Sequence, residues 1–207
     1  MESAAILAGG RATRFGGRDK GALVVDGRTI LQRQLTVLAQ VTEDILIVGA
    51  PGRPGTMDDR SDPSAAAIAP RRIVDIVPDC GPLGGIHAAL TAARGDAVFV
   101  AACDMPFLSG AFVSYLLGLA RGADAVVPRT GRGYHPLCAA YSRACLEPVS
   151  RRLAGGRLKT SELMLDVRTR IVTLEELDRF GGEAALLANV NTPDEYAVVA
   201  ARPDHKL

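Results

Sequence analysis

Short apolar segments alternate with longer segments of helical periodicity along the first part of the chain. Several short runs are apolar or β-branched almost throughout, as is typical of strands covered on both faces. We predict strands at Ser3–Ala8, Asp44–Gly49, Arg72–Val77, Asp96–Cys103 and Asp124–Val127. The segments between them space their apolar residues three or four positions apart, and we predict helices at Thr29–Gln40, Leu83–Ala93 and Ser109–Ala120. This alternation predicts an α/β fold: a three-layer, mostly parallel open sheet with helices on both faces.

The pattern is less regular after Pro136. There we predict a strand at Leu137–Tyr141, a helix at Arg143–Leu153, a short helix near Ser161–Asp166, a strand at Arg168–Thr173 and a last helix after Thr192. The polar, proline-containing segment Ala50–Pro70 is predicted to be a long loop. No tandem repeat or break in composition divides the chain, and its 207 residues suit a single domain spanning 1–207.

Composition and charge narrow the class of protein. Lys and Arg number 24 against 23 Asp and Glu, and aromatic residues make up 4% of the chain, which argues against a nucleic-acid binder. The longest uncharged segment, Met105–Ala120, is too short to cross a bilayer, so we expect no membrane span. The acidic start does not suit a secretory signal, and we expect a cytoplasmic protein. The four cysteines lack metal-site spacing and are expected to be core or loop residues.

The most informative segment is the loop that follows the first predicted strand, Leu7–Lys20. Its two Gly-Gly pairs let backbone N–H groups approach an anion closely. Ligands in open α/β sheets bind beyond the carboxyl ends of the strands. The side chains give the loop a local charge of +3, from Arg11, Arg14, Arg18 and Lys20 against Asp19. The loop therefore suits a triphosphate, although it matches neither G-x-x-x-x-G-K-[ST] nor G-x-G-x-x-G.

Asp104 follows another apolar strand and is a candidate metal ligand. Mg²⁺ prefers oxygen ligands and is commonly held by one or two carboxylates together with substrate phosphates, so a single Asp is sufficient. The alternative interpretation is that Asp104 only caps the turn into the next helix, with Pro106 directing the chain.

Four groups of motifs, in the same order along the chain, resemble those of the molybdenum cofactor guanylyltransferases, which are nucleotidyltransferases of Rossmann-like fold. They are Leu7-Ala8-Gly9-Gly10 with Arg14-Phe15-Gly16-Gly17 and Asp19-Lys20, Asp75 with Gly81-Pro82-Leu83-Gly84-Gly85, Cys103-Asp104-Met105-Pro106, and Asn189-Val190-Asn191-Thr192-Pro193. The resemblance runs from residue 5 to about residue 199. Phe15 replaces the usual Met, and Gly84 stands where Ala is common. The family's Asn after the second strand is absent from Val48–Pro51, so that contact is not carried over.

The resemblance implies an enzyme that transfers GMP from Mg-GTP to molybdenum-molybdopterin, forming molybdopterin guanine dinucleotide and pyrophosphate. It implies Lys20, Arg14 and Asp104 as catalytic residues, with Asp104 holding Mg²⁺. It also implies nucleotide or cofactor contacts at Leu7, Ala8, Gly9, Gly10, Lys20, Asp75, Asp104, Asn189 and Asn191. The part up to about residue 105 is expected to bind the nucleotide, and the remainder mainly the pterin. Expected partners are GTP, molybdenum-molybdopterin, and proteins that deliver the cofactor or accept it as molybdoenzymes.

Two acids and one histidine keep two interpretations each. Guanine presents N–H donors, so a carboxylate suits a guanine contact, and Asp75 and the neighbouring Asp79 are the candidates. The alternative interpretation of each is a solvated acid in a loop. His135 precedes Pro136, which favours an extended backbone, and it either has a structural role or contacts the pterin.

Two groups near the end of the chain are also ambiguous. Thr192–Glu195 forms a capping box with Pro at the first helical position, which explains those residues and leaves Asn189 and Asn191 as the functional candidates. Four basic residues close together in the sequence either hold an anionic pterin phosphate or form a solvated helix face. They are Arg151, Arg152, Arg157 and Lys159.

Three other functions stay open. Another nucleotidyltransferase, such as one that acts on a sugar phosphate, shares the chemistry, but those enzymes tend to have a longer Gly-rich loop with a Pro-Lys near its end. A molybdopterin cytidylyltransferase shares the chemistry, but its opening more often reads Leu-Ala-Ala-Gly, whereas Gly9-Gly10 and Asp19-Lys20 favour guanosine. A non-catalytic nucleotide or cofactor carrier would keep the fold without turnover, but the presence of both Lys20 and Asp104 favours an enzyme.

Overall fold

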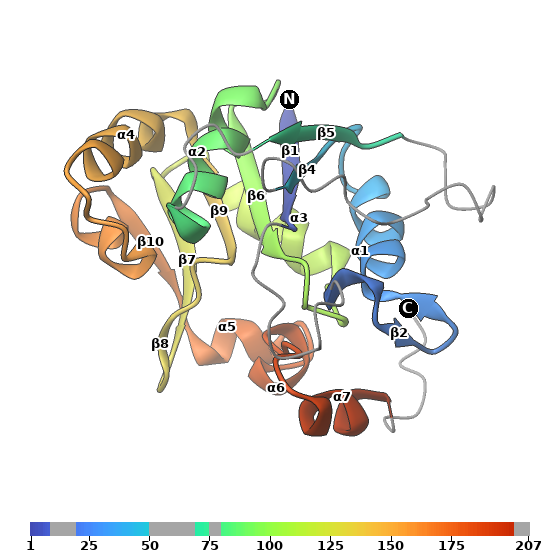
Figure 1. Cartoon of the computed structure of the whole chain (residues 1–207). Coiled ribbons are helices and arrows are strands. Elements are labelled where there is room, and N and C mark those ends of the chain that lie inside the picture. Colours follow the sequence, from blue (N-terminus) through green and yellow to red (C-terminus); the bar gives the residue numbers. More distant parts are fainter. Residues whose placement is uncertain (9–19, 50–68, 75–79, 201–207) are drawn as a thin grey trace.

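The computed structural model describes residues 1–8, 20–49, 69–74 and 80–200. These residues form an eight-stranded sheet in the order β10-β7-β9-β6-β1-β4-β5, with β8 paired to β7, and a separate hairpin of β2 and β3 (Figure 1). The strands are β1 (Glu2–Leu7), β2 (Val24–Val25), β3 (Arg28–Thr29), β4 (Asp44–Gly49), β5 (Arg71–Val74), β6 (Ala97–Ala102), β7 (Ala125–Thr130), β8 (Gly133–Tyr134), β9 (Cys138–Ser142) and β10 (Thr169–Val172).

Most neighbouring strands of the sheet run parallel. β1 pairs in parallel with β4 and β6, β4 with β5, and β10 with β7. β9 lies antiparallel between β6 and β7, and β8 returns antiparallel along β7. Leu7, the last residue of β1, is in register with Val48 of β4 and Ala102 of β6. The predicted mostly parallel sheet is confirmed, and the carboxyl ends of its central strands lie at one edge.

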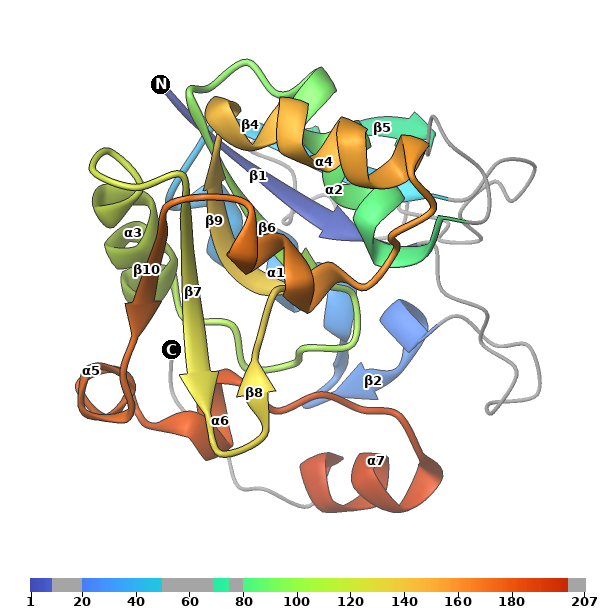
Figure 2. The same cartoon turned by 90° about the vertical axis from the view of Figure 1, so that its left-hand side faces the viewer.

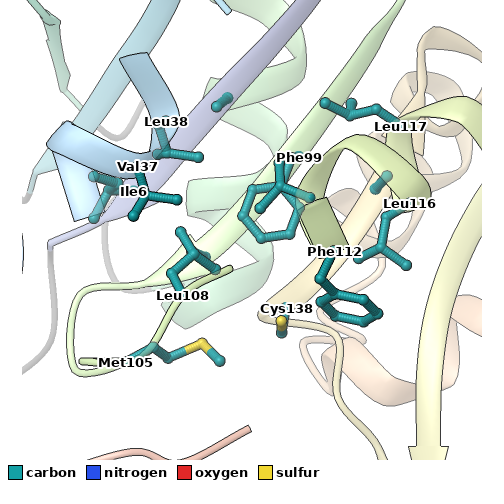
Figure 3. Close-up of a cluster of buried hydrophobic side chains, with 14 of the residues drawn as sticks. Ile6, Val37, Leu38, Phe99, Met105, Leu108, Phe112, Leu116, Leu117 and Cys138 are labelled. Atoms are coloured by element: carbon teal, nitrogen blue, oxygen red, sulfur yellow. The ribbon is translucent and has the colours of Figure 1, made fainter. Parts of the chain in front are cut away.

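Helices cover both faces of this sheet, as the two views in Figures 1 and 2 show. They are α1 (Ile30–Ala39), α2 (Gly81–Ala92), α3 (Gly110–Leu119), α4 (Leu146–Ala154), α5 (Leu174–Asp178), α6 (Glu183–Leu186) and α7 (Pro193–Ala200). Successive side chains of β6 point to opposite faces: Phe99 packs with α1 and α3, whereas Val98 packs with α2 and α4. Figure 3 shows the first of these clusters, in which Phe99 lies near Phe112 of α3. The three-layer prediction is therefore confirmed.

Local sequence explains where two of the helices begin. The Thr29 hydroxyl accepts the Gln32 N–H at 3.1 Å, and the Gln32 side chain accepts the Thr29 N–H at 2.8 Å, which is a capping box for α1. The Ser109 hydroxyl accepts the Phe112 N–H at 3.4 Å and caps α3. The predicted helices start at these capping residues, one position before the helical backbone.

The predictions were weakest for short elements. The predicted helix Arg143–Leu153 is divided into a 3₁₀ turn, Arg143–Cys145, and α4. The predicted helix Ser161–Asp166 is a 3₁₀ helix, Thr160–Leu165. β5 ends at Val74, and the rest of the predicted strand Arg72–Val77 lies outside the described residues. The hairpin β2–β3, β8, α5 and α6 were not predicted, because two to five residues carry little periodicity.

A hydrogen-bonded cluster closes the amino-end edge of the sheet around Asp44, which is 2% exposed. Its Oδ2 accepts the Ser3 hydroxyl at 2.6 Å and the Arg94 N–H at 2.8 Å. Its Oδ1 accepts Nη2 of Arg71 at 2.6 Å, and the same guanidinium donates to the Ala92 carbonyl. This one carboxylate therefore joins β1, β4, β5 and the turn before β6. Burial alone would raise the pKa of the carboxyl, but these hydrogen bonds outweigh burial and lower the pKa.

Candidate active site at the carboxyl edge of the central strands

The carboxyl ends of β1 and β6 lie side by side and define the candidate site. The Cys103 N–H donates to the Leu7 carbonyl at 3.2 Å, and the Ala8 N–H donates to the Val48 carbonyl at 2.8 Å. Leu7 is thus held against the turn that contains Asp104, and Ala8 is held against the end of β4. In open α/β sheets this is the edge at which ligands bind.

Part of the predicted phosphate loop falls outside the described residues. Gly9, Gly10 and Arg14 lie in the segment 9–19, and Asp75 lies in the segment 75–79, so their predicted roles stay predictions. The described chain resumes at Lys20, whose backbone begins a 3₁₀ turn, Lys20–Ala22.

Asp104 lies in the turn that follows β6 and is 9% exposed. Its neighbours on both sides are buried: Cys103 is 9% and Met105 5% exposed, and both belong to the core cluster with Phe99. Figure 3 shows Met105 at the edge of this cluster. A carboxylate in a shielded turn at the ligand-binding edge is an oxygen donor of the type that a hard divalent cation takes, so Asp104 fits the predicted metal.

The segment before α7 is held directly against this turn. The Val190 N–H donates to the Asp104 carbonyl at 3.0 Å, which places Asn189 and Asn191 on either side of that bond. Asn189 is exposed and Asn191 is partly buried. The structure therefore brings the predicted late motif to Asp104, although the two are far apart in the chain.

The predicted capping box of α7 is confirmed, and its acid also reaches one residue further back. The Thr192 hydroxyl accepts the Glu195 N–H at 3.2 Å, and Glu195 Oε2 accepts the Thr192 N–H at 3.1 Å. The same Oε2 accepts the Asn191 N–H at 2.6 Å. Glu195 therefore fixes the backbone of Asn191 as well as the start of the helix.

The hairpin β2–β3, which the sequence analysis did not predict, packs against the segment that carries Val190 and against α7. Asp26 and Gly27, its turn residues, have φ values of +51° and +76°, and Asp-Gly is a preferred pair for such tight hairpin turns. The Tyr196 hydroxyl donates to the Val24 carbonyl at 2.6 Å and joins α7 to the hairpin. The Asp-Gly pair between Val24–Val25 and Arg28–Thr29 was the signal that could have found it.

Two consecutive residues of α1 hold the turn around Asp104 from the other side. Gln34, which is 0% exposed, donates from Nε2 to the Ala102 carbonyl at 2.8 Å and to the Met105 carbonyl at 3.1 Å. Arg33 donates from Nε to the Pro106 carbonyl at 3.2 Å. Neither residue was predicted to belong to the site, because both contacts depend on the tertiary fold.

His135 directly follows β8, and its hydrogen bonds to neighbouring residues stabilise the connection between β7 and β9. Its Nε2 lies 2.9 Å from the Thr130 hydroxyl, and its backbone bonds to Pro128 and Cys138. Burial lowers the pKa of His135, with Glu183 opposing this and Arg132 adding to it.

The basic residues at the end of α4 are largely engaged in ion pairs. Arg152 is 2% exposed and donates to Glu162 at 2.9 Å and to Asp166 at 2.8 Å, so its guanidinium joins α4 to the following 3₁₀ helix. The exposed residues Arg151 and Lys159 pair with Glu147 and Glu162. The interpretation of Arg152 as a phosphate ligand is therefore wrong, because a buried cation held by two carboxylates is a structural group.

The four cysteines are free thiols. Cys103, Cys138 and Cys145 are buried, and Cys80 is partly buried. Burial raises the pKa of Cys138 to about 12, which keeps it a protonated, unreactive thiol. Among the described residues there is no group of three or more His, Cys, Asp or Glu side chains that could hold a metal ion, and no helix long and apolar enough to cross a membrane.

Comparison with known proteins gives one consistent result. Residues 4–166 match the family model described as MobA-like NTP transferase domain. The chain is 35% identical over 191 residues to the molybdenum cofactor guanylyltransferase of Desulfosudis oleivorans, covering 92% of this chain and 90% of that protein. It is 32% identical to a probable molybdenum cofactor guanylyltransferase of Pelotomaculum thermopropionicum, covering 92% and 87%.

Solved structures show the same fold. Molybdopterin-guanine dinucleotide biosynthesis protein A of Archaeoglobus fulgidus superposes with a TM-score of 0.76 at 24% identity, covering 97% of each chain. The 2-C-methyl-D-erythritol 4-phosphate cytidylyltransferase of Thermus thermophilus superposes with a TM-score of 0.67 at 20% identity, covering 97% of this chain and 98% of that one. The family match and the curated relatives together show that this chain is a nucleotidyltransferase and belongs to the MobA-like molybdenum cofactor guanylyltransferases.

Proposed function

We propose that this protein transfers GMP from GTP to the phosphate of molybdenum-molybdopterin, forming molybdopterin guanine dinucleotide and pyrophosphate. Membership of the guanylyltransferase family supports the reaction, since the curated relatives carry that name. The observation in the structure that supports it most is the meeting of three segments at the carboxyl edge: the end of β1, the turn around Asp104, and residues 189–191.

The reaction needs positioning and charge neutralisation rather than a covalent enzyme intermediate. An oxygen of the acceptor phosphate forms a bond to the α-phosphorus of GTP while the bond from that phosphorus to the bridging oxygen breaks. The electron pair leaves with pyrophosphate, and no oxidant or reductant is involved. Such transfers depend on orienting the two phosphates in line and on stabilising the charge that develops on their oxygens.

Asp104 is the residue that we propose to hold the metal, and we propose Mg²⁺ as that metal. When bound, the cation neutralises charge on the phosphate oxygens of the nucleotide. The hydrogen bonds around Asp104 hold its turn in one conformation before any ligand binds. The residues Lys20 and Arg14 are proposed to stabilise the triphosphate and the departing pyrophosphate.

The two substrates are proposed to bind to different parts of the chain. Leu7, Ala8, Gly9 and Gly10 would contact the nucleotide phosphates, and Asp75 would accept the guanine N–H groups. The remainder after about residue 105 would bind mainly the pterin, with Asn189 and Asn191 between the two substrates beside Asp104. We propose that the protein acts as a single domain in the cytoplasm, with GTP, molybdenum-molybdopterin, and the proteins that deliver the cofactor or accept it as its partners.

The decisive experiment compares GTP, CTP and ATP as donors to molybdopterin with Mg²⁺ present and measures pyrophosphate release. We expect release with GTP and little with CTP or ATP. Faster release with CTP would identify a cytidylyltransferase instead. Binding of GTP without release would identify a carrier. Repeating the assay with EDTA, and then with Mg²⁺ or Mn²⁺ restored, tests the metal requirement separately from the choice of base.

A further inference from the structure

Gln34 is a buried polar residue on the apolar face of α1. It is 0% exposed, and its helix neighbours Leu31, Leu35 and Leu38 all belong to the core cluster of that face. Its Nε2 makes the two hydrogen bonds to the Ala102 and Met105 carbonyls. Among the residues that the structure describes, its Oε1 is buried without a hydrogen-bond partner.

The two acceptors determine the orientation of this amide. Rotating the amide by half a turn would place Oε1 against two carbonyl oxygens, which cannot donate, so the donors must face the turn. A buried acceptor without a partner costs free energy, and an apolar side chain at this position would avoid that cost. The amide is therefore explained by what its two N–H groups hold, and not by packing of the core.

The group that they hold is the turn that carries Asp104. Ala102 ends β6, and Met105 follows Asp104, so the two bonds bracket the turn Cys103–Asp104 on both sides. The Asp104 carbonyl between them accepts the Val190 N–H. The backbone on each side of the carboxylate is thus fixed by donors from α1 and from the segment before α7.

We propose that Gln34 is a positioning residue that orients Asp104 toward the divalent cation and the triphosphate. The inference rests on the metal role that the proposed function gives Asp104. Residues that orient a metal ligand through hydrogen bonds typically change metal affinity or activity by about 10- to 100-fold when they are replaced. Gln34 does this without touching either substrate.

Gln34→Met is the test variant, because Met has a similar length and no N–H donor. We expect the Kd of Mn²⁺ for the GTP-bound protein, measured by electron paramagnetic resonance, to rise about tenfold, and kcat to fall about tenfold. The Kd of GTP in EDTA and the KM for the pterin acceptor should stay at the wild-type values. A residue with a merely structural role would not separate metal binding from nucleotide binding in this way.

Two control variants on the same helix separate positioning from stability. Thr36→Val removes a hydrogen bond to the Gln32 carbonyl within α1, and Leu38→Val removes one buried methylene from the same core cluster. Both should keep wild-type Mn²⁺ affinity below their unfolding temperatures. Gln34→Glu is the second test variant, since a neutral carboxyl group can donate one of the two bonds, and we expect its Mn²⁺ affinity to lie between wild type and Gln34→Met.

Wild-type Mn²⁺ affinity and kcat in Gln34→Met would overturn the inference, and so would an equal loss of Mn²⁺ binding in Leu38→Val. A wild-type protein that binds Mn²⁺ and GTP but releases no pyrophosphate would contradict the proposed function alone, because the binding comparison would still decide the role of Gln34. A wild-type protein that binds no Mn²⁺ with GTP would contradict both.

Discussion

The central strands of the sheet have a buried aspartate at their amino ends, Asp44, and another just beyond their carboxyl ends, Asp104. The two residues are held in different ways. At the amino end, the Asp44 carboxylate itself accepts the hydrogen bonds that join β1, β4 and β5. At the carboxyl end, the bonds described around Asp104 act on backbone carbonyls and come from Gln34 and Val190. At one edge the aspartate carboxylate is therefore itself a structural bridge, whereas at the other edge the described hydrogen bonds hold the backbone on both sides of the aspartate.

Asp104→Asn tests the functional half of this comparison and has the largest expected effect. The amide keeps the size of the side chain but removes the negative charge that a cation needs. We expect pyrophosphate release to fall by at least about 10³-fold, which corresponds to about 4 kcal/mol of transition-state stabilisation. The unfolding midpoint should stay near that of the wild type, because the bonds that hold the turn are retained. A rate within tenfold of wild type would remove Asp104 from the mechanism.

Lys20→Ala has the next largest expected effect. We expect kcat to fall by about 10²- to 10³-fold, the usual loss for one preorganised group that stabilises developing charge. Single-turnover measurements at saturating GTP would separate this loss from weaker binding. Lys20→Arg is the matched control, since it keeps the charge but changes its geometry, and its rate should lie between the other two. An unchanged kcat in Lys20→Ala would mean that the first loop binds the triphosphate without this side chain.

Asp44→Asn tests the structural half of the comparison. It breaks the pair with Arg71, and we expect a loss of about 3 kcal/mol in the free energy of unfolding, at the low end for a buried pair. The loss is moderated because the Arg71 side chain is 33% exposed and water can solvate it. Denaturant titration measures the change, and pyrophosphate release at 20 °C should change less than about threefold because the substitution lies at the opposite edge from the site.

The same carboxyl predicts the direction of the acid response. Its pKa is lowered in the folded state, so its contribution to stability is present above the unfolded pKa and is lost as pH falls through that value toward the folded pKa. The wild type should lose stability in this range more steeply than Asp44→Asn. Parallel pH profiles for the two proteins would contradict the bridging role of Asp44.

The sequence predicted the large elements better than the joins between them. The strand Asp44–Gly49 was predicted with its observed bounds, because its interior, Ile45–Val48, is apolar and buried on both faces of the sheet. The hairpin β2–β3 was missed, since two-residue strands have no readable period. Asp104 could be placed at a strand end from local pattern alone. Gln34 could not be assigned a role, because its acceptors are 68 and 71 residues away in the chain and its position is otherwise that of a core residue.

His135→Gln has the smallest expected effect and tests whether a polar residue in the carboxyl-terminal half of the chain must serve function. A glutamine can still bond to the Thr130 hydroxyl, so a structural histidine predicts an unchanged KM for the pterin acceptor. A pterin contact instead predicts a KM that rises about tenfold, which is the change for one lost hydrogen bond to a charged group.

The same variant tests the pH dependence of stability. Burial lowers the pKa of His135, so the folded state binds fewer protons than the unfolded chain as pH falls below about 6.5. The wild type should therefore lose a small amount of stability between that pH and the lower folded pKa, and the variant should not. Urea titrations at pH 7 and pH 5.5 measure this difference, and an identical pH response of the wild type and the variant would contradict the effect of burial on His135.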